Sequence, residues 1–112
     1  MSKLHGDVPY GTLDLMILKT LQVSGPLHGF GLAREIERVS EDLIRLNQGS
    51  IYPALVRLQQ RGLITASWGA SESNRRAKFY ALAPAGRQQL GAETESWRRT
   101  ALIVERFLAL EG

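Results

Sequence analysis

Residues 48–82, QGSIYPALVRLQQRGLITASWGASESNRRAKFYAL, decide the fold that the sequence predicts. Within residues 51–58 the large apolar side chains recur at helical spacing on one side. After Gly62 the spacing changes to every second residue, in the two runs 64–68 and 77–82. Alternation with a period of two is typical of strands. The stretch therefore predicts a helix that passes directly into a two-stranded hairpin.

Proline and glycine mark the limits of this helix. Proline lacks an N–H, so Pro53 is expected in the first turn, with the helix beginning near Gly49 or Ser50. Gly62 is placed to end it as the residue after the C-cap. Residues 69–76, between the two strands, are polar and too many for a tight two-residue turn.

Two more helices are predicted upstream. Apolar residues at helical spacing begin after Thr12, the expected N-cap, and stop at the sequence Ser24-Gly25-Pro26. A second helix follows Gly29, and its inward side carries three residues at helical spacing: Leu32, Ile36 and Val39. The order is thus helix, helix, helix and hairpin, which is the order of a winged helix-turn-helix.

The last element is a long helix from Pro84 to about Leu110, on the order of 40 Å at 1.5 Å per residue. A helix of this length overhangs a small domain, and a heptad-like stripe on it indicates a partner helix. We expect a second copy of the chain to pack on this stripe. Its residues are Leu90, Trp97, Ala101, Val104 and Leu108.

These elements predict a mainly α fold with a β-hairpin, divided into three parts. Residues 1–9 are expected to form an N-terminal arm, residues 10–83 a winged helix-turn-helix domain, and residues 84–112 a C-terminal dimerisation helix. A two-fold dimer of this kind presents two recognition helices to half-sites about one helical turn of DNA apart.

Composition sets limits on function. The 112 residues carry a net charge of +3 and a pI near 9.7, a mild bias toward polyanionic partners. The chain has no cysteine, which excludes disulfides, thiolate metal sites and cysteine nucleophiles. No stretch approaches the roughly 20 apolar residues of a membrane span, and residues 1–9 do not resemble a signal peptide. We expect a cytoplasmic protein with no membrane partner.

The third helix is expected to enter the major groove of double-stranded DNA and the hairpin to contact the adjacent backbone. Arg57 has the donors for guanine or a phosphate, Gln60 those for adenine, and Val56 fits a thymine methyl group. Hydroxyls near the helix N-terminus suit a phosphate. The full set of predicted DNA contacts is Tyr10, Gln48, Ser50, Tyr52, Pro53, Val56, Arg57, Gln60, Arg75, Arg76 and Lys78.

Other interpretations remain open at this level. The third helix has the pattern of any amphipathic helix with a wet side, and a basic loop alone usually indicates solvation. An enzyme is disfavoured, because the acidic residues and the two histidines form no triad order, metal spacing or phosphate loop. We expect no catalytic residue, metal or cofactor. A dimeric protein-interaction module without DNA binding and an RNA-binding protein are weaker alternatives.

Several short stretches together resemble the PadR family of transcriptional regulators. The resemblance covers roughly residues 10–90 and extends through Leu82, Pro84, Ala85 and Gly86. Its motifs are GTLDL at 11–15, GPLHGFG at 25–31, NQGSIYPAL at 47–55, RL at 57–58, GLI at 62–64 and NRRAKFY at 74–80. The short chain is similar to the subfamily with a single C-terminal helix.

The resemblance implies a winged-helix repressor that binds a pseudo-palindromic operator as a dimer and often releases it when a small molecule binds. It also places Tyr10, Tyr52 and the hairpin cations where family members touch DNA. One departure is visible: Ala83 stands where family members often carry a threonine before the proline of the last helix. Loss of such a cap costs about 1 kcal/mol, so it weakens the helix start slightly and leaves function unchanged.

A ligand site is a further expectation. The resemblance to multidrug-binding members of the family implies that Trp97 stacks on a planar, small aromatic inducer at the dimer centre, beside Ala101. The alternative is that Trp97 simply packs in the core, since tryptophan buries a large area. Leu15 and Leu18 are predicted to lie off the core stripe of the first helix and to help line this site. His28, a loop histidine before a helix, is interpreted as structural.

Overall fold

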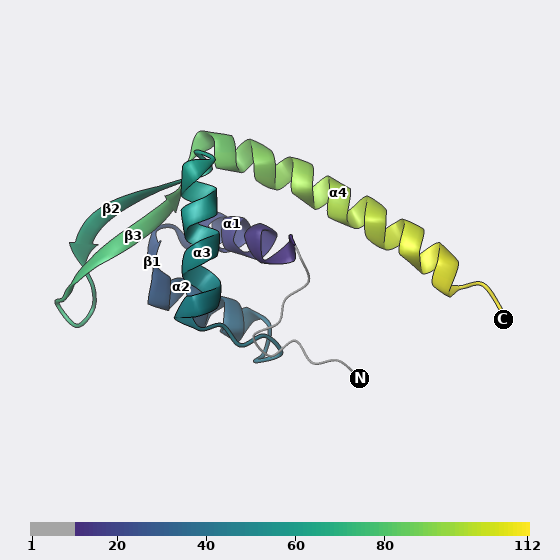
Figure 1. Ribbon diagram of the computed structural model, residues 1–112, viewed down its shortest axis with the longest axis horizontal. Helices are drawn as coiled ribbons and strands as arrows, with labels where there is room; N and C mark the ends of the chain where they lie inside the picture. Colours follow the sequence, from purple (N-terminus) through teal and green to yellow (C-terminus); the bar gives the residue numbers. More distant parts are fainter. Residues whose placement is uncertain (1–10) are drawn as a thin grey trace.

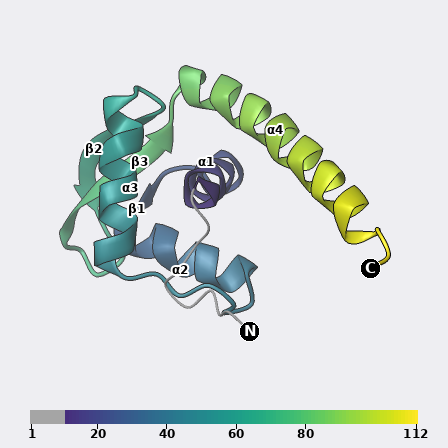
Figure 2. The same ribbon diagram turned by 45° about the vertical axis from the view of Figure 1, so that its right-hand side comes forward.

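Four helices and a three-stranded sheet make up residues 11–112, the part of the chain that the computed structural model describes (Figure 1). The elements are α1 (Thr12–Ser24), β1 (Leu27–His28), α2 (Gly29–Val39), α3 (Gln48–Gln60), β2 (Ile64–Ala70), β3 (Arg76–Leu82) and α4 (Pro84–Leu108), which is the predicted order with one short strand added. The first three helices and the sheet pack together, while α4 extends away from them (Figures 1 and 2). The predicted fold class, mainly helical with a hairpin, is confirmed.

Side chains just before α2 and α3 fix where these helices begin. The His28 Nδ1 atom accepts a hydrogen bond from the Gly31 amide at 3.0 Å, and the Asn47 Oδ1 atom accepts one from the Ser50 amide at 3.0 Å. Each bond satisfies one of the amide donors that a helix start leaves without an intrahelical partner. The structural interpretation of His28 is supported by this cap.

The sequence prediction placed two of the helix starts incorrectly. Gly11, with φ 87°, occupies the N-cap position of α1, and Thr12 is already helical. α3 begins at Gln48, so Pro53 lies in its second turn rather than its first. Proline there removes the amide that would bond to the Gly49 carbonyl four residues earlier. Gly62 follows α3 with φ 74°, as predicted.

The hairpin strands are joined by a third, short strand. β3 lies in the middle, antiparallel to both neighbours, with Leu27 opposite Tyr80 in β1 and Ile64 opposite Leu82 in β2. β1 was not predicted, because two residues are too short for any alternation to show. The predicted loop is also shorter than expected, since β2 and β3 continue until Ala70 pairs with Arg76.

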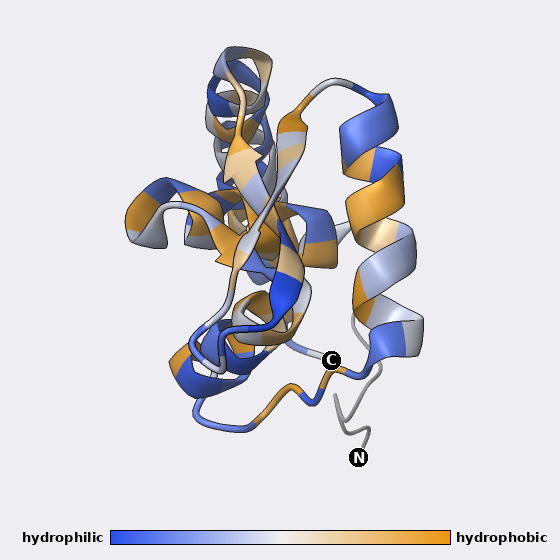
Figure 3. Ribbon diagram, turned by 90° about the vertical axis from the view of Figure 1, so that its left-hand side faces the viewer, coloured by the Kyte–Doolittle hydropathy of each residue, from blue (hydrophilic) through white to orange (hydrophobic). Residues whose placement is uncertain are grey.

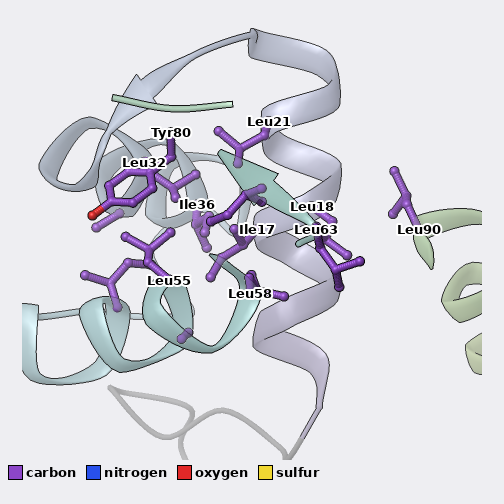
Figure 4. Packing of buried hydrophobic residues seen from close by; sticks show 14 residues of the cluster. Ile17, Leu18, Leu21, Leu32, Ile36, Leu55, Leu58, Leu63, Tyr80 and Leu90 are labelled. Carbon is purple, nitrogen blue, oxygen red and sulfur yellow. The ribbon is translucent and has the colours of Figure 1, made fainter. Parts of the chain in front are cut away.

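The hydrophobic core lies between α1, α2, α3 and the base of the hairpin (Figure 4). Leu18 is completely buried there, which corrects its predicted place off the core stripe. Val39 is 65% exposed although it was expected inside, because it is the last residue of α2. The largest fully buried side chains are Ile17, Leu18, Leu21, Leu32, Ile51, Leu55, Leu58 and Ile64.

α4 is anchored to this core only by its first turns. Gly86 approaches the α3–β2 junction so closely that a Cβ atom there would lie 2.1 Å from the Leu63 carbonyl oxygen. Leu90 is 4% exposed and belongs to the core of its own chain, so its assignment to the dimer stripe is wrong. Ala83, at the N-cap, makes no side-chain cap, as the sequence implied.

Candidate nucleic-acid interface

The outward side of α3 is open to solvent. Ile51, Leu55 and Leu58 hold the opposite side in the core, which leaves Pro53, Val56 and Gln60 exposed. Val56 is 51% exposed, although its side chain is apolar. The structure therefore places three of the predicted DNA contacts, Pro53, Val56 and Gln60, together on one side of the helix. Gln48 is exposed in the first turn, and Ser50 is partly covered beside the Asn47 cap.

Tyr52 lies on the flank of α3 that faces α2 and the sheet. Its hydroxyl rests against Gly29, where a Cβ atom would lie only 2.7 Å from it. Burial raises the pKa of Tyr80, and the nearby Tyr52 raises it further. Tyr52 is therefore held between α2 and β3, with 37% of its surface exposed. Sequence reasoning selected Tyr52 but not the glycine that makes room for it.

Arg57 lies on the other flank of α3, toward α1. Its Nη2 atom donates a hydrogen bond to the Asp14 Oδ1 atom at 2.9 Å. The side chain of Arg57 remains 56% exposed, whereas that of Asp14 is only 15% exposed. The sequence predicts Arg57 as a DNA contact but does not reveal this partner, because the two residues lie 43 positions apart.

The cations of the hairpin lie at its tip, on exposed positions. Arg75, Arg76 and Lys78 are all exposed. The Arg76 guanidinium lies over the Trp68 ring, 4.4 Å from its centroid, in a cation–π contact. Trp68 is 59% exposed. The sequence prediction did not include it, although a large aromatic residue so close to a cationic loop could have indicated a cation–π partner.

The charged face of the hairpin is the one that meets α3 at its base. Side chains two residues apart on a strand share a face, so Arg76 and Lys78 share a face with Tyr80. Tyr80 is buried close to Tyr52 of α3. β2 runs back along α3, so the hydrophilic hairpin tip lies toward the N-terminal end of α3 (Figures 1 and 3). The tip cations and the open side of α3 thus belong to one continuous region.

A cavity of ≈ 490 Å³ opens on the other side of the molecule, between α1, α2 and α4. Leu15 and Trp97 both line it, which agrees with the predicted ligand site, while Leu18 does not. Its walls are mainly apolar, with a few polar groups at the margin. The lining residues are Leu15, Met16, Lys19, Thr20, Ile36, Val39, Ser40, Ile44, Leu90, Thr94, Trp97 and Arg98.

Beyond this cavity, α4 carries apolar side chains that nothing in residues 11–112 covers. Trp97 is 52% exposed, Val104 47% and Leu108 72%, and Ala101 lies between them. Further exposed apolar residues flank this row in the last turns: Leu102, Ile103, Phe107 and Leu110.

Among the described residues, no three histidine or acidic side chains are grouped so as to bind a metal ion. Within the same part of the chain, no helix has both the length and the apolarity to cross a membrane. Tyr10, the one predicted DNA contact before α1, lies outside the described residues.

Comparison with known proteins gives a consistent result. The model of the transcriptional regulator PadR-like family matches residues 17–92. A transcriptional regulator from Clostridium thermocellum superposes with a TM-score of 0.80 at 27% identity, over 90% of this chain and 97% of that one. A PadR-like transcriptional regulator from Bacillus cereus superposes with a TM-score of 0.75 at 28% identity, over 90% and 95% of the two chains.

Two curated proteins also match in sequence. A 37.1 kDa protein of transposon TN4556 from Streptomyces fradiae is 37% identical over 84 residues. That match covers 75% of this chain but only 23% of the transposon protein. A protein named X from Lysinibacillus sphaericus is 21% identical over 94% of this chain and 95% of its own length.

Proposed function

Because this chain belongs to the PadR-like family of transcriptional regulators, and is thus a DNA-binding regulator and not an enzyme, we propose a more specific role. It acts as a ligand-responsive repressor that binds a pseudo-palindromic operator as a homodimer. The observation that carries the proposal is the open side of α3 next to the cationic face of the hairpin. Repression, rather than activation, is inferred from the family resemblance. A cytoplasmic location is inferred because the protein must reach the DNA that it regulates.

In this proposal α3 lies in the major groove. Val56 and Gln60 face the base edges, where an apolar group suits thymine and an amide suits adenine. The Ser50 hydroxyl and the free amides of the first turn lie near a phosphate. Pro53 lies on the same side, and its rigid, uncharged ring allows α3 to approach the DNA closely. Arg75, Arg76 and Lys78 contact the backbone beside the groove. Tyr10, Gln48, Tyr52 and Arg57 complete the contact set.

The exposed row on α4 supports the homodimer. Trp97, Val104 and Leu108 recur at coiled-coil spacing and are exposed in the part of the chain that the structure describes. Pairing of two α4 helices buries both rows and sets two α3 helices about one turn of duplex apart. We therefore assign residues 84–112 to dimerisation. Leu90 is the exception, because it packs in the hydrophobic core of its own chain.

The cavity supports a ligand. Its volume of ≈ 490 Å³ is in the usual range for small-molecule sites, and apolar walls with few polar groups suit an aromatic compound. Trp97 lies between the cavity and the exposed row, so one side chain serves both the ligand and the partner chain. A planar inducer that stacks on Trp97 changes the surface on which the second α4 packs.

Two measurements on the purified full chain test this proposal. Sedimentation is expected to show a dimer for the wild type and monomers for Trp97→Asp, because a carboxylate at that position is buried unpaired in the interface. Electrophoretic mobility shifts at two salt concentrations are expected to show duplex binding that weakens steeply with salt. A monomeric wild type, or one that binds no duplex in low-salt buffer, contradicts the proposal.

A further inference from the structure

The ion pair between Arg57 and Asp14 joins α3 to the start of α1. One guanidinium nitrogen, Nη2, donates to one carboxylate oxygen, Oδ1, over 2.9 Å. Asp14 is the third residue of α1, and its carboxylate lies mostly under its neighbours, while more than half of the Arg57 side chain faces solvent. The carboxylate is therefore the fixed partner, and the guanidinium is the group presented outward.

This geometry leaves Arg57 most of its hydrogen-bonding capacity. A guanidinium carries five N–H donors in a planar fork, and a single bond through Nη2 occupies one of them. Guanine presents two acceptors, O6 and N7, which two neighbouring donors of such a fork match. A long side chain that is free in solution loses rotamer freedom when it binds a base. The bond to Asp14 restricts Arg57 before DNA arrives.

The negative charge of Asp14 also selects the kind of contact. An arginine without a partner attracts any phosphate, regardless of sequence. A carboxylate 2.9 Å behind the guanidinium largely cancels that attraction and repels a phosphate that approaches closely. The edge of a guanine carries no net charge, so it meets much less of this repulsion than a phosphate does. The pair is consequently better suited to a base than to the backbone.

We propose that Asp14 is a positioning residue that orients Arg57 to read a guanine in each operator half-site. This inference rests on the proposed function, because it requires α3 to lie in the major groove. Asp14 touches no DNA itself. It converts Arg57 from a general cation into a base-specific donor, so residues from two helices determine one position of the operator.

The experiment starts from duplexes that the wild-type full chain selects from a random pool. Affinity is then measured for the preferred duplex and for versions in which each guanine of the half-site is replaced. The variants are Asp14→Ala, Arg57→Ala and the double substitution. Glu95→Ala is the matched control, because it removes an exposed acid on α4 and changes net charge equally.

We expect one guanine whose replacement costs the wild type about tenfold or more in affinity, the range of a bidentate base contact. Asp14→Ala is expected to lose most of that preference, and the double substitution is expected to lose no more than Arg57→Ala alone. Affinity for unrelated duplexes stays the same or rises in Asp14→Ala, since a negative charge has been removed. Glu95→Ala keeps the preference of the wild type.

A purely structural tie between α1 and α3 gives a different result. Asp14→Ala then lowers the melting temperature and weakens all duplexes by the same factor, with the guanine preference intact, which overturns the inference. Asp14→Asn guards against loss of the fold, because it keeps the side-chain shape without the charge, and it too is expected to reduce the preference. A wild type that binds duplex without any guanine preference also overturns the inference, whereas one that binds no duplex overturns the proposed function itself.

Discussion

Replacing Arg75 and Arg76 with alanine removes two of the three cations at the hairpin tip. Both side chains are exposed, and the backbone turn they flank is closed by main-chain bonds, with the Ser71 amide donating to the Arg75 carbonyl at 2.8 Å. The substitutions therefore leave the hairpin bonds in place. The net charge falls from +3 to +1, since two positive side chains are lost.

The expected effect is a change in salt dependence. Each phosphate contact contributes about 0.9 to the slope of log affinity against log salt concentration. Two lost contacts on one chain reduce the slope by roughly 1.8, and four on a dimer reduce it by roughly 3.6. Between about 50 and about 200 mM salt, the wild type loses about 12-fold more affinity than the variant if one chain binds, and about 150-fold more if two chains bind.

The assay is fluorescence anisotropy with a labelled duplex at several salt concentrations. Arg99→Ala combined with Arg106→Ala is the matched control, because both residues are exposed on the side of α4 away from Trp97. α4 leaves the sheet at the end opposite the hairpin tip (Figure 1), so the control slope is expected to equal that of the wild type. An unchanged slope in the hairpin variant refutes the assignment of the tip to the DNA backbone.

Four more outcomes follow from single residues. Gly86→Ala places a Cβ atom 2.1 Å from a backbone oxygen at the α3–β2 junction. Calorimetry is therefore expected to show that the free energy of unfolding falls by about 2 kcal/mol. A Cβ atom at Gly91, in the same helix, meets only open space. Gly91→Ala is therefore expected to raise the free energy of unfolding by up to about 1 kcal/mol. Gly29→Ala pushes the hydroxyl end of the Tyr52 ring outward, where 37% of the residue is already exposed, so the melting temperature is expected to change little while duplex affinity falls. A parallel fall of both disproves the proposed role of Tyr52. Burial raises the pKa of Tyr80. The stability of the fold is therefore expected to decline above about pH 10, because the phenol ionises more readily once unfolding exposes it. Tyr80→Phe is expected to abolish that decline in thermal unfolding measured at alkaline pH.

The elements with a strong local signal could be predicted from the sequence. Apolar spacing and the glycine at 62 located α3, and the change of period located both hairpin strands. β1 left no signal, because a strand of two residues has no period and is defined only by its pairing with β3. The position of Pro53 misled the prediction, since the Asn47 cap starts the helix at Gln48, one or two residues before the predicted start at Gly49 or Ser50.

The site could be predicted residue by residue but not as pairs. Single residues such as Tyr52, Arg57 and Arg76 have chemistry that suits DNA. What holds each of them lies elsewhere in the chain: Gly29 under Tyr52, Asp14 beside Arg57, and Trp68 under Arg76. Spacing along one helix or strand does not reveal such partners, because they depend on how separate elements pack.

The wrong assignment of Leu90 to the dimer stripe has a simple physical cause. A stripe shows that a side of a helix is covered, without showing whether its own chain or another covers it. On α4 the first turns, with Leu90, are covered by the core of the same chain, and the exposed row begins only at Trp97. The free part from Trp97 to Leu108 spans roughly 17 Å at 1.5 Å per residue, about three helical turns. So short a seam makes Trp97, its largest side chain and also a wall of the cavity, the residue on which the proposed pairing of two chains most depends.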